Sequence, residues 1–322
     1  MIYNPITKRL SADPFIVYDQ ETGYYYCTYT AADSDGGSVL KISRARKVQD
    51  AADGEEIVLL QEGDGKNACN IWAPELYQDQ DGTWYVYASA FATKEMDWNT
   101  LKILVFKSLN KNPFDGFTFV KAFDELSHAF DPTIYAAKNG KLYMCYTQNM
   151  YAFGFQRYEQ RLYIREMLSP TELGDKFAEI SAAELPFELS KPNVKINEGP
   201  FFLEKDEKLF IAYSANGCGN EDYCLGLLVY KGGDLCDKGS WKKYDTPILY
   251  KGEKLFGPGH ASFFSSPDKT ELWCAFHAFV DNDSTKVYKD RFACVNKVEF
   301  NEEGIPMIGA ARVSEICAPS GE

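Results

Sequence analysis

The sequence predicts an all-β fold, a single five-bladed β-propeller domain that covers residues 1–322. Three observations predict it: a two-strand pattern recurs along the whole chain, it recurs about every 60 residues, and helical patterns are scarce. The chain of 322 residues is 45% hydrophobic and 15% aromatic. This composition is sufficient for a large core and excludes an intrinsically disordered chain.

Each repeat begins with a short polar opening that usually contains proline, followed by two apolar residues, a polar turn and a second, aromatic-rich strand. The five opening residues, spaced by 60, 58, 67 and 62 positions, are Asp13, Ala73, Asp131, Glu198 and His260. The first apolar residue of the second strand follows the opening by 11 or 12 positions, at Tyr25, Trp84, Leu142, Leu209 and Leu272. Two strands around a tight polar turn are typical of a β-hairpin.

The rest of each repeat has room for two further strands, which completes a four-stranded propeller blade. Candidate outer strands are Ser38–Ile42, Leu101–Phe106, Leu162–Glu166 and Cys224–Val229. Ser169–Gly174 reads as one weak helical turn. A β-sandwich with accidental spacing is the alternative, and five recurrences of one internal offset disfavour it.

Charge excludes two classes of partner. The net charge is 34 − 47 = −13 and the pI is near 4.9. A nucleic-acid footprint or a membrane-docking surface needs clustered Lys and Arg, so we expect neither partner. Residues 1–5 carry no basic stretch followed by an apolar segment, which predicts a cytoplasmic protein unless the chain is a trimmed secreted one.

The nine cysteines are an odd number and lack metal-type CxxC pairs. Most of them read as small apolar residues of strands. Cys218 and Cys224 lie six residues apart, and the sequence leaves open whether they form a disulfide.

The inner strands of a propeller begin near its axis, so the five opening residues should converge at one mouth of the central channel. Three of them are carboxylic acids and one is histidine, a costly gathering of like charge that indicates a functional site. Two carboxyl groups that flank a bond are what glycoside hydrolysis needs. Trp72, next to Ala73, would then rise at the wall of this site as a sugar-stacking ring, with core packing as the equally weighted alternative.

At these residues the chain resembles glycoside hydrolase family 43, five-bladed propeller enzymes that act on arabinose- and xylose-containing glycans. The matching stretches span nearly the whole chain in the order of the family: residues 12–14 (ADP), 71–75 (IWAPE), 130–133 (FDPT), 197–200 (NEGP) and 257–260 (GPGH). The resemblance implies an inverting mechanism without a required cofactor.

The resemblance also implies a role for each matching residue. Asp13 corresponds to the general base that deprotonates water, Glu198 to the general acid, and Asp131 to the carboxylate that orients the acid and keeps its pKa raised. Such a base and acid stand roughly 6.5–9.5 Å apart. His260 corresponds to a histidine at the pocket floor that helps to bind substrate or a structural calcium ion in the central channel. Arg291 corresponds to an arginine that binds sugar hydroxyls, with a surface strand arginine as the alternative.

Within the family, residues 223–228, 239–241 and 257–263 resemble exo-acting α-L-arabinofuranosidases, some of which cleave α-1,5 linkages. The implied partner is an arabinose- or xylose-containing oligosaccharide. A β-xylosidase and an endo-arabinanase of the same family are the alternatives. Xylosidases usually carry a C-terminal β-sandwich, and the chain ends after the fifth repeat, which favours the arabinofuranosidase.

Two other functions compete with this one. The related invertase group uses an Asp nucleophile with retention, but its Asn-Asp-Pro and Glu-Cys signatures are absent here. A sugar-binding propeller without catalysis would need no convergent acids. Pocket depth, and hence exo or endo cleavage, depends on the loops Ala90–Asn99, Gln148–Tyr158 and Val280–Lys289, whose aromatic residues either stack on sugars or, for most of them, pack within the loops.

Overall fold

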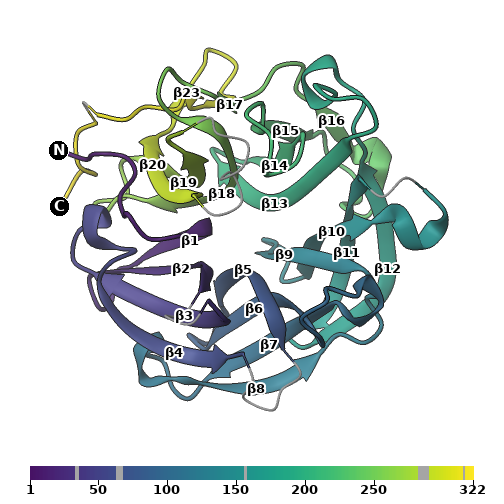
Figure 1. Ribbon diagram of the computed structural model, residues 1–322, viewed down its shortest axis with the longest axis horizontal. Helices are drawn as coiled ribbons and strands as arrows, with labels where there is room; N and C mark the ends of the chain where they lie inside the picture. Colours follow the sequence, from purple (N-terminus) through teal and green to yellow (C-terminus); the bar gives the residue numbers. More distant parts are fainter. Residues whose placement is uncertain (33–35, 63–67, 156–157, 282–289, 315) are drawn as a thin grey trace.

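The structure is a computed structural model and describes residues 1–32, 36–62, 68–155, 158–281, 290–314 and 316–322. Groups of antiparallel strands are arranged around a common centre, and short 3-10 helices lie in the connections between them (Figure 1). The prediction of an all-β fold is confirmed. No helix among the described residues is long and apolar enough to span a bilayer.

The first two groups are four-stranded sheets whose strands pair in chain order. They consist of β1 (Ala12–Asp19), β2 (Tyr24–Ala32), β3 (Ser38–Ala45) and β4 (Glu55–Gln61), then β5 (Cys69–Gln78), β6 (Trp84–Phe91), β7 (Lys102–Ser108) and β8 (Phe117–Ala122). Alternation of aromatic or β-branched residues with small ones suits strands that are buried on both faces.

The next two groups belong to one ten-stranded sheet, joined by a short parallel pairing of β11 with β13. The third group contains β9 (Ala129–Ala136), β10 (Leu142–Asn149), β11 (Glu159–Ser169) and β12 (Glu172–Ser181). The fourth contains β13 (Lys195–Lys205), β14 (Lys208–Ala215), β15 (Cys224–Tyr230), β16 (Trp241–Lys243) and β17 (Leu249–Tyr250). Where a helical turn was predicted at Ser169–Gly174, Pro170 and Thr171 form the turn between β11 and β12, so that prediction is wrong.

The last group is a three-stranded sheet of β18 (Phe256–Ser265), β19 (Leu272–Phe279) and β20 (Phe292–Lys297). Short strands follow it: β21 (Glu299–Phe300) and β22 (Pro306–Met307), which pair, and β23 (Gly309–Ala310), which pairs with β17. The N-terminal segment lies beside β20, since the N–H of Ile6 donates to the carbonyl of Ala293. The 3-10 helices are Val48–Asp50, Trp98–Thr100, Pro113–Asp115, Met150–Phe153, Pro186–Glu188 and Lys238–Ser240.

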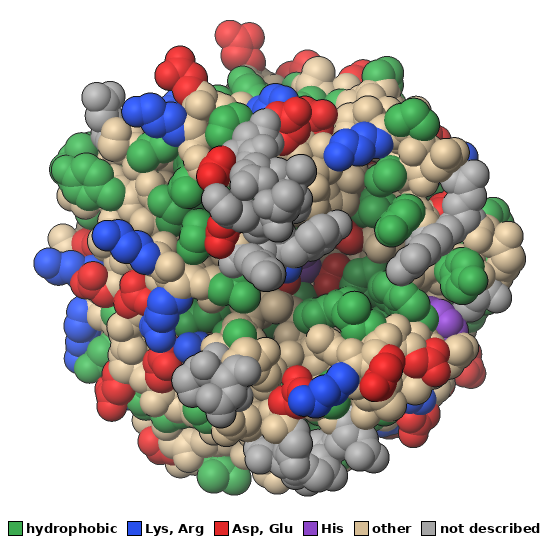
Figure 2. All heavy atoms as spheres, in the orientation of Figure 1, with side chains coloured by type: hydrophobic (Ala, Val, Ile, Leu, Met, Phe, Trp, Pro, Cys, Tyr) green, Lys and Arg blue, Asp and Glu red, His purple; other side chains and the backbone are tan. Residues whose placement is uncertain are grey.

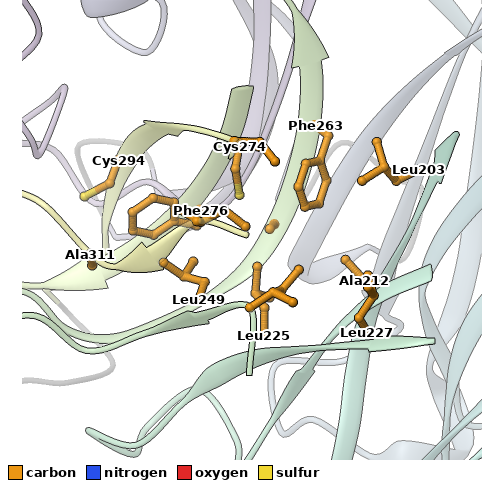
Figure 3. Packing of buried hydrophobic residues seen from close by; sticks show 14 of the residues in the cluster. Leu203, Ala212, Leu225, Leu227, Leu249, Phe263, Cys274, Phe276, Cys294 and Ala311 are labelled. Carbon is orange, nitrogen blue, oxygen red and sulfur yellow. The ribbon is translucent and has the colours of Figure 1, made fainter. Parts of the chain in front are cut away.

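Hydrophobic clusters lie between consecutive groups and hold them together. One cluster packs β13–β15 against β18–β20 through residues such as Leu225, Phe263 and Phe276 (Figure 3). Equivalent clusters connect the first group with the second, the second with the third, the third with the fourth, and the last with the first. Each group therefore buries apolar side chains on both faces, and the arrangement closes on itself.

The innermost strand of every group carries the same irregularity near its beginning. Its register with the second strand breaks there, and the residue at the corresponding position has a positive φ: Asp13 (55°), Ala73 (44°), Asp131 (50°), Gly199 (53°) and His260 (47°). In β5 and β18 a second break nearer the start of the strand contains a further residue with a positive φ, Asn70 and Gly257. We call these five residues the bulge residues. A left-handed residue in a β-bulge bends the strand and redirects its side chains.

The bulge residues correct one predicted equivalence. Glu198 was aligned with Asp13 and Asp131, but the residue in the corresponding conformation is Gly199, one position later. A Cβ atom on Gly199 would lie only 3.0 Å from Nδ1 of His260, so a side chain at this position would crowd the imidazole ring. The acid of the fourth group, Glu198, is therefore displaced to the preceding position.

Candidate active site

Three carboxyl groups from different strand groups are buried at the start of the inner strands. Asp13 lies on β1, Asp131 on β9 and Glu198 on β13, with exposed fractions of 8%, 6% and 7%. The backbone N–H of Gly199 donates to Oδ2 of Asp131 at 3.2 Å, so the carboxyl group of Asp131 is bonded to the residue that follows Glu198. Figure 2 shows that this face is hollowed near its centre, with acidic and histidine side chains at the bottom.

Asp13 is surrounded by polar groups from other parts of the chain. The hydroxyl of Thr30 donates to its Oδ2 at 2.5 Å. Nη1 of Arg291 lies 3.4 Å from its Oδ1, and Nδ1 of His260 lies 3.3 Å from the same oxygen. The structure therefore brings His260 and Arg291 to the predicted site, and the alternative of a surface arginine is wrong.

The environment of Asp13 favours its ionised form. Burial acts to raise the pKa of Asp13, but positive charge on His260 and Arg291 outweighs it and holds this pKa well below the ordinary value. Burial lowers the pKa of His260. Arg291, whose pKa is raised by the surrounding acidic groups despite burial, stays charged throughout and is the lasting source of this effect.

The environments of Glu198 and Asp131 raise the pKa values of these two groups and so favour their protonated forms. Burial raises the pKa of Glu198 to about 7; the charge of Asp13 adds to this, and Tyr223 and Arg291 oppose it. The pKa of Asp131 is raised well above its ordinary value, first by burial and then by the charges of Glu198 and Asp13. Two buried carboxyl groups that repel each other hold a proton more tightly than either would alone.

Sequence reasoning missed two hydroxyl groups and a histidine at this site. Thr30 and Thr147 contact the carboxyl groups of Asp13 and Asp131, at 2.5 Å and 3.3 Å. His277 Nδ1 lies 3.2 Å from Oδ1 of Asp13. A signal was present: a polar residue, usually Ser or Thr, recurs near the end of the second strand of each group, 15 to 17 positions after each bulge residue.

Trp72 lies in an aromatic cluster at the start of β5. Its ring contacts Phe91 edge-on with centroids 4.8 Å apart, and Trp98 with centroids 6.3 Å apart. Phe130, the residue before Asp131, also packs edge-on against Trp98, with centroids 5.8 Å apart. Trp72 is partly buried. The cluster supplies the core packing that was one of the two predictions, and the stacking of Trp72 on a sugar stays a prediction.

The aromatic rings of the loop after β10 are largely exposed, although that of Phe155 packs beneath the guanidinium of Arg161, 4.6 Å from it. Their exposed fractions range from 43% to 61%, at Tyr151, Phe153, Phe155 and Tyr158. Trp98 instead packs as expected. The loop Val280–Lys289 lies almost wholly outside the described residues.

A calcium ion is not well matched to the described donor atoms. Calcium prefers six to eight oxygen ligands, whereas His260 offers a nitrogen that faces Asp13. In the described part of the chain, no three His, Cys, Asp or Glu residues are grouped so that they could hold a metal ion. All nine cysteines are free, so Cys218 and Cys224 form no disulfide.

The fold and the site together define a class of protein: an all-β chain with three buried carboxyl groups of divergent pKa on its inner strands. A family model described as glycosyl hydrolases family 43 matches residues 2–306. The chain belongs to this family, and the resemblance seen in the sequence is confirmed.

Similar proteins are named as arabinofuranosidases. The extracellular exo-α-(1→5)-L-arabinofuranosidase of Streptomyces avermitilis is 30% identical over 319 residues, which cover 95% of this chain and 63% of that protein. The enzyme of the same name from Streptomyces chartreusis is 31% identical over 283 residues, 85% of this chain and 81% of that protein. The crystal structure of an α-L-arabinofuranosidase from Lactobacillus brevis superposes with a TM-score of 0.84 at 28% identity, covering 97% of this chain and 98% of that one.

These relatives correct one prediction. The chain was expected to be cytoplasmic, but both Streptomyces proteins are named extracellular, which contradicts that expectation. The beginning of the sequence was therefore a poor guide to the compartment.

Proposed function

We propose that this protein is an inverting glycoside hydrolase that removes α-L-arabinofuranosyl residues from arabinan or arabino-oligosaccharides, with exo-cleavage of α-1,5 linkages favoured. The observation that supports it most is the difference between the pKa values of two buried carboxyl groups. The pKa of Asp13 is held low, and that of Glu198 is raised to about 7. Near neutral pH one is an ionised base and the other a protonated acid, which is the division of labour that inversion requires.

In this proposal Asp13 takes a proton from water, whose oxygen forms the new bond to the anomeric carbon. Glu198 gives its proton to the glycosidic oxygen as the bond from that oxygen to the anomeric carbon breaks. Asp131, which accepts the N–H of Gly199 at 3.2 Å, orients the strand that carries Glu198 and raises the pKa of the acid. Arg291, Trp72 and His260 contribute contacts to the sugar, and no cofactor takes part.

The proposed scaffold is one domain, a five-bladed β-propeller over residues 1–322. Its support is the fivefold recurrence of the bulge residues, together with the apolar clusters that link each group of strands to the next and the last to the first. The central position of the site on such a scaffold suits a small sugar ring. The partner is an arabinose-containing oligosaccharide, for which the names of the relatives give independent support.

The test is a panel of substrates with product analysis, comparing 4-nitrophenyl α-L-arabinofuranoside, α-1,5-arabinotriose, linear arabinan and xylobiose. We expect release of single arabinose units, and proton NMR of the first-formed sugar should show the β-anomer, the product of inversion. The variants Glu198→Gln and Asp13→Asn should each lose activity while keeping the far-UV circular dichroism of the wild type.

Each part of the proposal can fail separately. A first-formed α-anomer would exclude inversion. Faster cleavage of xylobiose would make the enzyme a β-xylosidase, and mid-chain cleavage of arabinan would make it an endo-arabinanase. Binding of arabinotriose without any turnover would favour the non-catalytic sugar-binding protein.

A further inference from the structure

A ring of hydrogen bonds connects the inner strands around the centre of the molecule. In four cases the backbone N–H of a bulge residue donates to a hydroxyl on the second strand of the preceding group. The pairs are Ala73 to Thr30 (2.8 Å), Asp131 to Ser89 (3.0 Å), Gly199 to Thr147 (3.1 Å) and His260 to Ser214 (2.7 Å).

The fifth bond closes the ring, and here the acceptor is different. The backbone N–H of Asp13 donates to Nδ1 of His277 at 3.1 Å. His277 occupies on β19 the place that Thr30 has on β2, because it pairs with the residue before His260 just as Thr30 pairs with Ala12, the residue before Asp13. The first and last groups of strands are thus connected through an imidazole.

An imidazole nitrogen cannot do what a hydroxyl does at this place. The hydroxyl of Thr30 accepts the N–H of Ala73 and at the same time donates to the carboxylate of Asp13. A ring nitrogen either carries a proton or accepts one. If Nδ1 of His277 accepts the N–H of Asp13, the proton of the neutral ring must be on Nε2.

We infer that His277 is a positioning residue for Asp13: as the uncharged Nε2–H tautomer it accepts the N–H of Asp13, completes the ring and sets the place of this carboxylate. One further observation supports this: the side chain of His277 is fully buried, and its ring stacks on Tyr223 with centroids 5.5 Å apart and planes 15° apart, so its orientation is fixed. In this tautomer the Nε2–H group is a buried donor without a hydrogen-bond partner within the described residues, which is the cost of the arrangement. Nδ1 also lies 3.2 Å from Oδ1 of Asp13, so a proton on Nδ1 would instead donate to the carboxylate, and the location of the proton decides between the two arrangements.

The role of His277 in catalysis rests on the proposed function, in which Asp13 is the base. The tautomer of His277 can be tested independently of that function. Long-range proton–nitrogen NMR of the imidazole rings reports the tautomer directly. The chain has three histidines, so the signals of His277 are those lost in His277→Asn. We expect a protonated Nε2 and an unprotonated Nδ1; a proton on Nδ1 would overturn the proposed ring.

Two variants separate the hydrogen bond from the packing. His277→Asn can place its amide oxygen where Nδ1 stands, whereas His277→Leu fills a similar volume without an acceptor. With 4-nitrophenyl α-L-arabinofuranoside we expect kcat of the Leu variant to fall roughly 10- to 100-fold with KM within about threefold, the usual scale for a misplaced reacting group. The Asn variant should recover most of kcat.

Equal losses of kcat in the two variants, or wild-type kcat in His277→Leu, would refute the positioning role. Thermal unfolding of both variants shows whether a loss of activity is only a loss of folded protein. Failure of the proposed function has a different signature, because Asp13→Asn would then remain active whatever the NMR spectra of His277 show.

Discussion

The carboxyl group of Asp131 accepts a hydrogen bond from the backbone N–H of Gly199 at 3.2 Å, and Gly199 directly follows the proposed acid, Glu198. This bond joins the third strand group to the fourth at the centre of the molecule. It explains how a residue that need not touch the scissile bond can influence the group that does.

Replacing Asp131 by Asn should move the pKa of the acid. Repulsion between ionised Asp131 and Glu198 raises the pKa of Asp131. If Asp131 in turn raises the pKa of Glu198, as the proposed role requires, an amide at position 131 lets Glu198 lose its proton at lower pH. The measurement is the pH dependence of kcat/KM, whose upper limb should shift to lower pH. An upper limb that stays in place would exclude Asp131 as a modulator of this pKa.

The pH dependence of the wild-type rate can also be predicted, because the proposed acid must be protonated and the proposed base ionised. Glu198 acts in its protonated form, so the rate should fall as pH rises above about 7, the value to which its pKa is raised. Asp13 acts ionised and its pKa is lowered, so the acid limb should lie below the ordinary aspartate value of about 3.9. Glu198→Gln should reduce kcat by about 10²- to 10⁴-fold and abolish the upper limb of the residual activity.

Gly199→Ala should damage the site through a contact, not only through backbone strain. The new Cβ atom would lie 3.0 Å from Nδ1 of His260, at a φ of +53°. Gly140→Ala is the matched control, because Gly140 also has a positive φ but nothing within 4 Å of its Cβ position. We expect the free energy of unfolding to fall by about 1 kcal/mol more in Gly199→Ala than in the control, with a loss of kcat. Equal effects of the two changes would show strain alone.

Glu75 should make stability decrease as pH rises. Burial raises the pKa of Glu75 well above its ordinary value, and a hydrogen bond from Thr133 opposes this only in part. Because the folded state holds this proton more tightly than the unfolded state, its stabilising effect is complete below about pH 4.3 and is lost as pH rises from there towards the raised pKa. Glu75→Gln stays neutral, so urea unfolding at pH 5 and pH 8 should show a smaller loss of stability than in the wild type. Glu302→Gln, a change at an exposed carboxyl group, should behave as the wild type does.

The buried ion pair of Lys243 and Glu188 should contribute far more to stability than an exposed pair. Nζ of Lys243 lies 2.6 Å from Oε1 of Glu188, with side chains 8% and 0% exposed, and also 3.1 Å from Oδ1 of Asn197, the residue before Glu198. Lys243→Met leaves a buried charge unpaired and should cost about 3–5 kcal/mol in urea unfolding. Lys297→Met removes a pair that is 41% and 20% exposed and should cost less than about 1 kcal/mol; similar losses would contradict this account.

The sequence predicted much of this architecture because strand periodicity and turn chemistry are local. The four predicted outer strands lie within or largely within β3, β7, β11 and β15. The convergence of Asp13, Asp131 and Glu198 followed from recurrence alone. Local patterns could not reveal the one-residue displacement of Glu198, because it depends on the ring of His260 packed over Gly199. His277 occupies a position at which a polar residue recurs in every group, but that pattern does not show its contact with Asp13, which is 264 positions away.

The displacement at Gly199 has a consequence for engineering. Building the chain from five copies of its first unit would put an aspartate at each inner position and an alanine, the equivalent of Ala12, in the place of Glu198. Such a protein would have identical aspartates at its inner positions and no equivalent of the proposed acid. In the proposed mechanism hydrolysis thus depends on one repeat that differs from the others, and making all repeats identical would abolish it.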